Sequence, residues 1–119
     1  MAGLFRYPKR RIKKLIQQGD YKEALEFGKS LEDKYSNDPD FLFIMGGIYY
    51  ILDDAQNTLY YFDRSLEINA NDIETLLLKA NVHLYLKELN SVIDCCEKVL
   101  EIDPKNRRAE EILDSLKAD

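Results

Sequence analysis

The sequence predicts an all-α fold built from tandem helical repeats, and three observations carry that prediction. Similar segments recur every 34 residues without an insertion. Within each segment, apolar residues recur at steps of three and four, the spacing of an amphipathic helix. The chain has only 5 glycines and 3 prolines among its 119 residues, too few for an all-β chain punctuated by many tight turns.

The repeat is visible as aligned pairs of identical or similar apolar residues. These pairs include Leu42 with Leu76, Gly46 with Ala80, Leu66 with Leu100, and Ile68 with Ile102. We therefore predict three repeats over 5–38, 39–72 and 73–106, followed by a final helix in 107–119. The whole chain, 1–119, is predicted to be a single domain.

Helix boundaries follow from the residues that start or stop helices. Pro8 cannot lie inside a helix, so the first helix is expected to begin there and to be short. Gly19-Asp20 separates the two helices of the first repeat. Asp53-Asp54 does the same in the second, where either aspartate can cap the next helix. We expect each repeat to be a helix–turn–helix.

The ends of the second and third repeats carry similar stop signals. The polar cluster 69–72 ends the second repeat, and Asp103-Pro104 ends the third. After Pro104, Ala109, Ile112 and Leu113 share one helical face with Leu116. We expect this last helix to cover the apolar side of the third repeat.

A helix–turn–helix period of 34 residues resembles the tetratricopeptide repeat family. The residues that carry the resemblance are Gly19-Asp20-Tyr21 with Ala24, Gly46 with Tyr49 and Phe62, and Ala80 with 100–104. The resemblance implies a short right-handed solenoid with a C-terminal capping helix. Small side chains at 46 and 80 would let the second helix of a repeat approach the first. The sequence departs from the pattern at Ile12, Thr58 and Val92, where small residues are usual, and at Ser36 and Ala70, where proline is usual.

The resemblance also implies a function in protein–protein interaction, as an adaptor or scaffold. In this family, the first helices of the repeats line a concave groove that binds a peptide or a helix of a partner. The repeat register predicts eight contact residues in such a groove: Lys9, Lys13, Phe43, Tyr50, Leu77, Asn81, Leu84 and Tyr85. The lysines would steer acidic residues of the ligand, and the Asn81 amide would hold its backbone. Gly47 would leave room for close approach.

One subclass of the family clamps the C-terminal carboxylate of heat-shock chaperones with Lys and Asn, then Asn, then Lys and Arg. The matching positions in this chain are Lys9, Lys13, Ile44, Glu74 and Leu78. Only the first lysine matches, and the carboxylate of Glu74 would repel the ligand. The sequence therefore argues against this clamp.

Two other functions stay open. The repeats carry net charges of +3, −5 and −2, so head-to-tail self-assembly is electrostatically plausible, and the groove could take up Phe5–Tyr7 or a neighbour's final helix. The basic run Pro8–Lys14 could contact nucleic acid. That alternative is the weaker one, because the net charge is −5 and stacking aromatics are sparse beside the run.

The residues needed for catalysis or metal binding are scarce. The chain has one histidine, His83, and two adjacent cysteines, Cys95 and Cys96, which make a poor disulfide. We expect the histidine and the thiols to pack, with no enzyme activity, no cofactor and no metal site. Reduced cysteines favour a cytoplasmic setting. The longest uncharged run, Phe41–Leu52, is too short to span a bilayer.

Overall fold

A computed structural model describes residues 7–117, which form seven helices and no strand. By their contacts these residues fall into two compact units, one ending at Ile68 and one beginning at Asn69. The all-α prediction is confirmed. The first repeat was predicted to start at residue 5, which lies outside the described residues. Of the segment Phe5–Tyr7, only Tyr7 is described.

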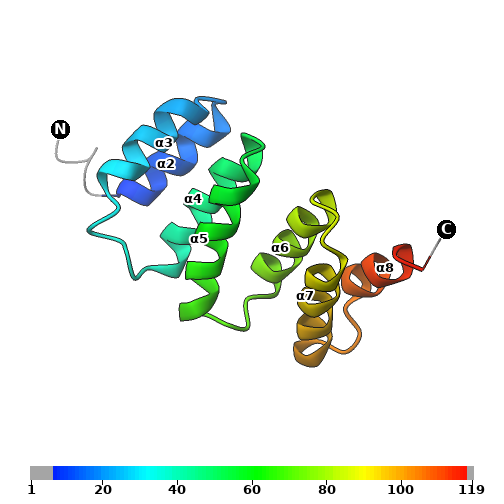
Figure 1. The fold of residues 1–119 in the computed structure, drawn as a ribbon. Coiled ribbons are helices and arrows are strands. Elements are labelled where there is room, and N and C mark those ends of the chain that lie inside the picture. Colours follow the sequence, from blue (N-terminus) through cyan, green and yellow to red (C-terminus); the bar gives the residue numbers. More distant parts are fainter. Residues whose placement is uncertain (1–6, 118–119) are drawn as a thin grey trace. The chain divides into compact units, whose positions relative to one another are not determined.

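The N-terminal unit contains two helical hairpins. Its helices are α2 (Pro8–Gln17), α3 (Tyr21–Ser30), α4 (Pro39–Ile51) and α5 (Ala55–Ile68). Within this unit α2 packs beside α3, α4 beside α5, and both α2 and α3 contact α4 (Figure 1). The first helix begins at Pro8 as predicted, since proline suits the first turn of a helix.

The C-terminal unit contains one hairpin and a further helix. Its helices are α6 (Ile73–Tyr85), α7 (Leu89–Ile102) and α8 (Arg107–Ser115). Helix α7 lies between α6 and α8 and contacts both (Figure 1). The predicted final helix is thus present and packs on the third repeat. Helices α4, α6 and α8 begin 34 residues apart, which is the period seen in the sequence.

The starts of these three helices share one capping arrangement. Asp38, Asp72 and Asn106 stand at the N-cap positions. The Oδ1 atom of Asp38 accepts hydrogen bonds from the amides of Asp40 (3.0 Å) and Phe41 (3.3 Å), and that of Asn106 accepts one from the amide of Ala109 (2.9 Å). These bonds satisfy amides that have no partner inside the helix.

The turns between paired helices are also alike. Gly19, Asp53 and Lys87 have φ of +81°, +60° and +60°. In each turn the next amide donates back to a carbonyl five residues earlier: Asp20 to Leu15 (2.9 Å), Asp54 to Tyr49 (3.0 Å) and Glu88 to His83 (2.9 Å). This is the Schellman arrangement, in which a left-handed residue ends the helix. The residue that caps α5 is Asp54, whose Oδ1 accepts from the amide of Asn57 (3.1 Å), while Asp53 forms the turn.

The close contact in the N-terminal unit is between α4 and α5. A Cβ at Gly46 would lie 2.5 Å from the ring of Phe62, which is fully buried. The same ring stacks on Phe43, with ring centroids 5.7 Å apart. Position 46 therefore requires glycine for α5 to approach this closely. At the neighbouring Gly47, a Cβ would meet no atom within 4 Å.

Helix α7 buries both cysteines of the chain. Cys95 and Cys96 form no disulfide, and Cys96 is fully buried beside Val92 and Val99 on the same helix face. Burial, assisted by the neighbouring Cys95, raises the pKa of Cys96 to about 11. The thiol therefore stays protonated and unreactive at neutral pH. The expectation that both thiols pack is confirmed.

Adjacent glycines on α4 give opposite predictions for substitution by alanine. Gly46→Ala should lower the free energy of unfolding by about 1–3 kcal/mol, because the new methyl group must displace the Phe62 ring. Gly47→Ala should raise it by about 0.5–1 kcal/mol, because alanine favours the helix and the site is open. Urea denaturation of both variants checks the pair. Equal effects at the two positions would contradict the close α4–α5 contact.

Candidate functional site

The predicted contact residues lie on the first helix of each hairpin. Helices α2 and α4 of the N-terminal unit carry Lys9, Lys13, Phe43 and Tyr50. Helix α6 of the C-terminal unit carries Leu77, Asn81, Leu84 and Tyr85. Each of these helices ends in a Schellman turn, and α4 and α6 also begin at an aspartate N-cap.

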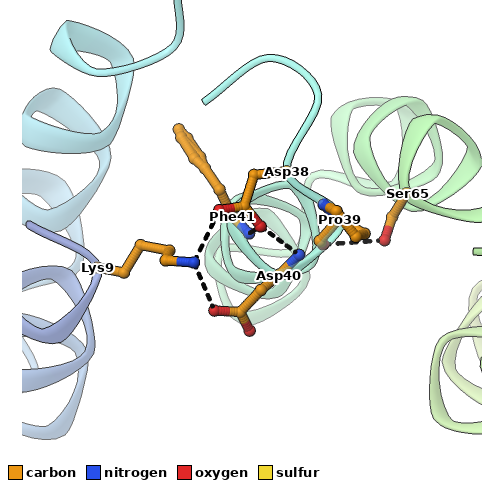
Figure 2. Close-up of polar contacts among 6 residues, drawn as sticks. All are labelled: Lys9, Asp38, Pro39, Asp40, Phe41 and Ser65. Carbon is orange, nitrogen blue, oxygen red and sulfur yellow. Dashed lines mark hydrogen bonds and ion pairs between the residues drawn. The ribbon is translucent and has the colours of Figure 1, made fainter. Parts of the chain in front are cut away.

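Lys9 is occupied by contacts inside the N-terminal unit. Its Nζ lies 2.7 Å from Oδ2 of Asp38 and 3.4 Å from Oδ2 of Asp40, so it ties α2 to the first turn of α4 (Figure 2). On the other side of that turn, the Ser65 hydroxyl donates to the carbonyl of Pro39 at 3.0 Å. The geometry makes Lys9 a link between helices rather than a free cation.

This link shifts the pKa of both partners. The hydrogen bond to Asp38 raises the pKa of Lys9, with burial opposing it and the Asp38 and Asp40 charges assisting. Burial alone would raise the pKa of Asp38, but the bonds from Lys9 and from the amides of Phe41 and Asp40 outweigh burial and lower it. Both charged forms are thus favoured in the folded state.

The other three residues of the N-terminal unit differ in what they offer a ligand. Lys13 is exposed and makes no ion pair with any residue in 7–117. Phe43 is half-buried and stacks on Phe62. Tyr50 is 39% exposed, and the next two residues, Ile51 and Leu52, are exposed as well. The last turn of α4 is therefore an exposed apolar surface.

The C-terminal unit exposes a similar surface at the end of α6. Leu84 is 37% exposed and Tyr85 79% exposed. Asn81 is half-buried, and its side-chain amide makes no hydrogen bond to the rest of the described chain. Leu77 is only 3% exposed, so it offers a ligand almost no surface. It lies on the packed face of α6, whereas the register alone placed it in the groove.

The structure adds exposed residues that the sequence analysis did not select. Leu86 and Leu89, which follow Tyr85 in the chain, are exposed as well, as is Leu52 after the end of α4. The signal was available, because the runs Tyr50–Leu52 and Leu84–Leu86 lie 34 residues apart. The corresponding residues of the first repeat are Ile16-Gln17-Gln18, which are largely polar.

The single histidine, His83, is held by a neighbouring carboxylate. The ring of His83 has one polar contact, its Nδ1 lying 2.9 Å from Oε1 of Glu88. No group of three or more potential ligands in residues 7–117 could hold a metal ion. No helix in that range is both long and apolar enough to cross a membrane.

Comparisons with known proteins agree with this architecture. Residues 73–106 match the family described as "Tetratricopeptide repeat". No curated protein sequence matches the chain significantly. The solved structures with a similar fold include three domains. One is the first repeat domain of Spaghetti (RPAP3) bound to the HSP90 peptide SRMEEVD, with a TM-score of 0.81, 20% identity, and coverage of 93% of this chain and 91% of that one.

The second is the second repeat domain of human RPAP3 in complex with the HSP70 peptide SGPTIEEVD, with a TM-score of 0.82, 16% identity, and coverage of 94% and 93%. The third is the chaperone SycD of Yersinia enterocolitica in complex with a peptide of the translocator YopD, with a TM-score of 0.86, 13% identity, and coverage of 98% and 95%. The fold is that of a tetratricopeptide repeat domain. The resemblance predicted from the sequence is thereby confirmed, and identities this low bear on the fold alone.

The link between Lys9 and Asp38 predicts a pH-dependent part of the stability. Asp38 has a lowered pKa, so its contribution is present above its ordinary value of 3.8 and is lost as pH falls through the lower folded value. Lys9 has a raised pKa, so its contribution is present below 10.5 and is lost as pH rises through the higher folded value. Partial exposure limits the effect to about 0.5–1 kcal/mol.

The measurement is the free energy of unfolding of wild type and Lys9→Met across pH. The difference should be largest between these limits and should shrink at both extremes. Lys13→Met is the matched control, since the Lys13 ammonium has no partner in the described chain, and it should show no such pH profile. A constant difference for Lys9→Met at every pH would contradict the ion pair.

Proposed function

We propose that this tetratricopeptide repeat domain is an adaptor that binds a short segment of a partner protein through the first helices of its repeats. The observation that carries the proposal is the exposed apolar surface at the end of α4, repeated at the equivalent position of α6. Solved domains of the same fold hold peptides of HSP90, HSP70 and YopD. Exposed apolar patches of this kind mark interaction surfaces.

The chemistry of these surfaces defines the ligand. Tyr50 and Tyr85 present aromatic rings with a hydroxyl at the edge, so they can bury a ligand's apolar side chain and still form a hydrogen bond. Open space beside Gly47 admits a ligand backbone, and the Asn81 amide can both donate to a backbone and accept from it. Lys13 favours an acidic residue in the ligand. Such a segment would be apolar and carry at least one acidic residue.

The proposal is one of binding rather than catalysis. The Cys96 thiol is buried and protonated at neutral pH, so it is not placed to act as a nucleophile, and the one polar contact of the single histidine is to Glu88. We place the protein in the cytoplasm, where two thiols that form no disulfide stay reduced. Helices held by caps and Schellman turns give a preformed surface, so most of the ordering cost on binding falls to the ligand.

A peptide selection with tyrosine variants tests the surface. The full chain would be used to select binders from a random peptide library, and the affinity of the best peptide would be measured by fluorescence anisotropy. Tyr50→Ala should weaken the affinity of a peptide that binds the N-terminal unit, and Tyr85→Ala that of a peptide that binds the C-terminal unit. Each loss should be about tenfold or more, because aromatic anchors dominate such interfaces. Both tyrosines are exposed, so thermal stability should change little.

Tyr60→Ala is the matched control. Tyr60 is also a well-exposed tyrosine (54%), but it lies on α5, the second helix of its hairpin. Its removal should leave the affinity unchanged. The proposed surface is wrong if Tyr60→Ala lowers the peptide affinity as much as Tyr50→Ala and Tyr85→Ala do. It is also wrong if neither of those two variants lowers the affinity.

The chaperone peptides of the similar structures give a negative prediction. The peptide SRMEEVD should not bind measurably, even at about millimolar concentration. Of the positions that match the carboxylate clamp, Lys9 is paired with Asp38, Ile44 is buried and Glu74 is an exposed acid. Isothermal titration with this peptide checks the prediction, with an amidated C-terminus as the control. Binding that requires the free carboxylate would show that a clamp exists.

A further inference from the structure

Helix α2 carries a basic stripe that its own unit does not use. Arg10, Lys13 and Lys14 are exposed, while Ile12 and Leu15 on the opposite side of the helix are buried. None of the three cations makes an ion pair within residues 7–117. At helical spacing, residues at positions i, i+3 and i+4 share one face. The stripe is therefore a compact patch of three unpaired positive charges.

The repeat register shows that this stripe lies on the helix face that α4 uses for packing. Thirty-four residues after Arg10 and Lys14 stand Ile44 and Ile48 of α4, and both are buried in the core of the N-terminal unit. The position that α4 uses for packing is thus charged and exposed in α2. A partner for this face must supply negative charge.

Helix α8 carries the complementary stripe. Glu110, Glu111 and Asp114 are exposed, and none of them pairs with a cation in the described part of the chain. The opposite side of α8 contains Ala109, which is buried, and Ile112, which is half-buried, so this side packs in the C-terminal unit. The carboxylates therefore point away from that packing.

The residue spacing of the basic stripe, counted from its N-terminal end, equals that of the acidic stripe counted from its C-terminal end. The basic residues lie at steps of 0, 3 and 4 from Arg10, and the acidic residues lie at steps of 0, 3 and 4 back from Asp114. If the helices run antiparallel and face to face, Arg10 lies opposite Asp114. The two lysines then lie opposite the two glutamates, one helical turn along. All six charges are paired, with no like charges opposed.

We propose that α8 of one copy docks antiparallel on α2 of a second copy through these two stripes. The proposal goes beyond peptide binding, and of the predicted peptide contacts it involves only Lys13. The contact is heterologous, so it can close into a small ring or extend as a chain. Because the six charges are exposed, the association is weak and depends on salt.

Sedimentation equilibrium of the full chain tests this proposal. The average mass should rise with protein concentration at about 0.02 M salt, and the association constant should fall about tenfold or more at about 0.5 M salt. Lys13→Glu with Lys14→Glu should abolish association, and so should Glu110→Lys with Glu111→Lys. An equimolar mixture of these two double variants should associate again, because the reversed stripes match each other.

The control variants reverse exposed charges outside the stripes. Lys22→Glu with Lys29→Glu on α3, and Glu97→Lys with Glu101→Lys on α7, change the net charge by the same amounts. They should associate as the wild type does, and circular dichroism verifies the fold of all variants. A monomer at every concentration would overturn the proposal. So would association that survives the stripe reversals, or a mixture of reversed variants that stays monomeric.

Discussion

The turn that joins the two helices of each hairpin is the constraint on which the rest depends. A left-handed residue ends the first helix, and the next residue both closes that helix with its amide and leads into the second helix. In two of the three turns the left-handed residue is Asp53 or Lys87, which costs each about 1 kcal/mol more than glycine. Backbone hydrogen bonds hold the geometry in all three. Because the turn recurs every 34 residues, α4 and α6 each expose the same part of their last turn.

The fold was predictable because its determinants are local. The 34-residue period, Pro8 at a helix start, and the small residue at position 46 can all be recognised without knowing the structure. The turn at Asp53-Asp54 was also predictable, although the division of roles between the two aspartates was not. Both residues suit an N-cap, and only the backbone hydrogen bonds show that Asp54 takes that place.

The candidate site was less predictable because exposure depends on distant neighbours. The register placed Lys9 on the ligand-facing side, but its ammonium is held by Asp38, 29 residues away. The same register grouped Leu77 with Leu84, yet the first is buried and the second is exposed. Periodicity identifies the face of a helix, whereas the side chains that cover that face come from elsewhere in the fold.

The apolar surfaces at the ends of α4 and α6 and the basic stripe of α2 respond to salt in opposite ways. Apolar contacts at the ends of α4 and α6 strengthen in salts that are excluded from protein surfaces. Contacts through the basic stripe of α2 weaken as any salt screens them. Peptide binding and copy-to-copy docking can therefore be separated by salt alone, even though Lys13 is available to both.

The position of the thiols has a consequence for following the dynamics of the chain. Both cysteines lie on α7 in the C-terminal unit, and the N-terminal unit up to Ile68 contains none. A reagent that alkylates thiols can reach Cys96 only when that unit opens, since the side chain is fully buried. The rate at which Cys96 is labelled therefore reports how often the C-terminal unit opens, and no added probe is needed.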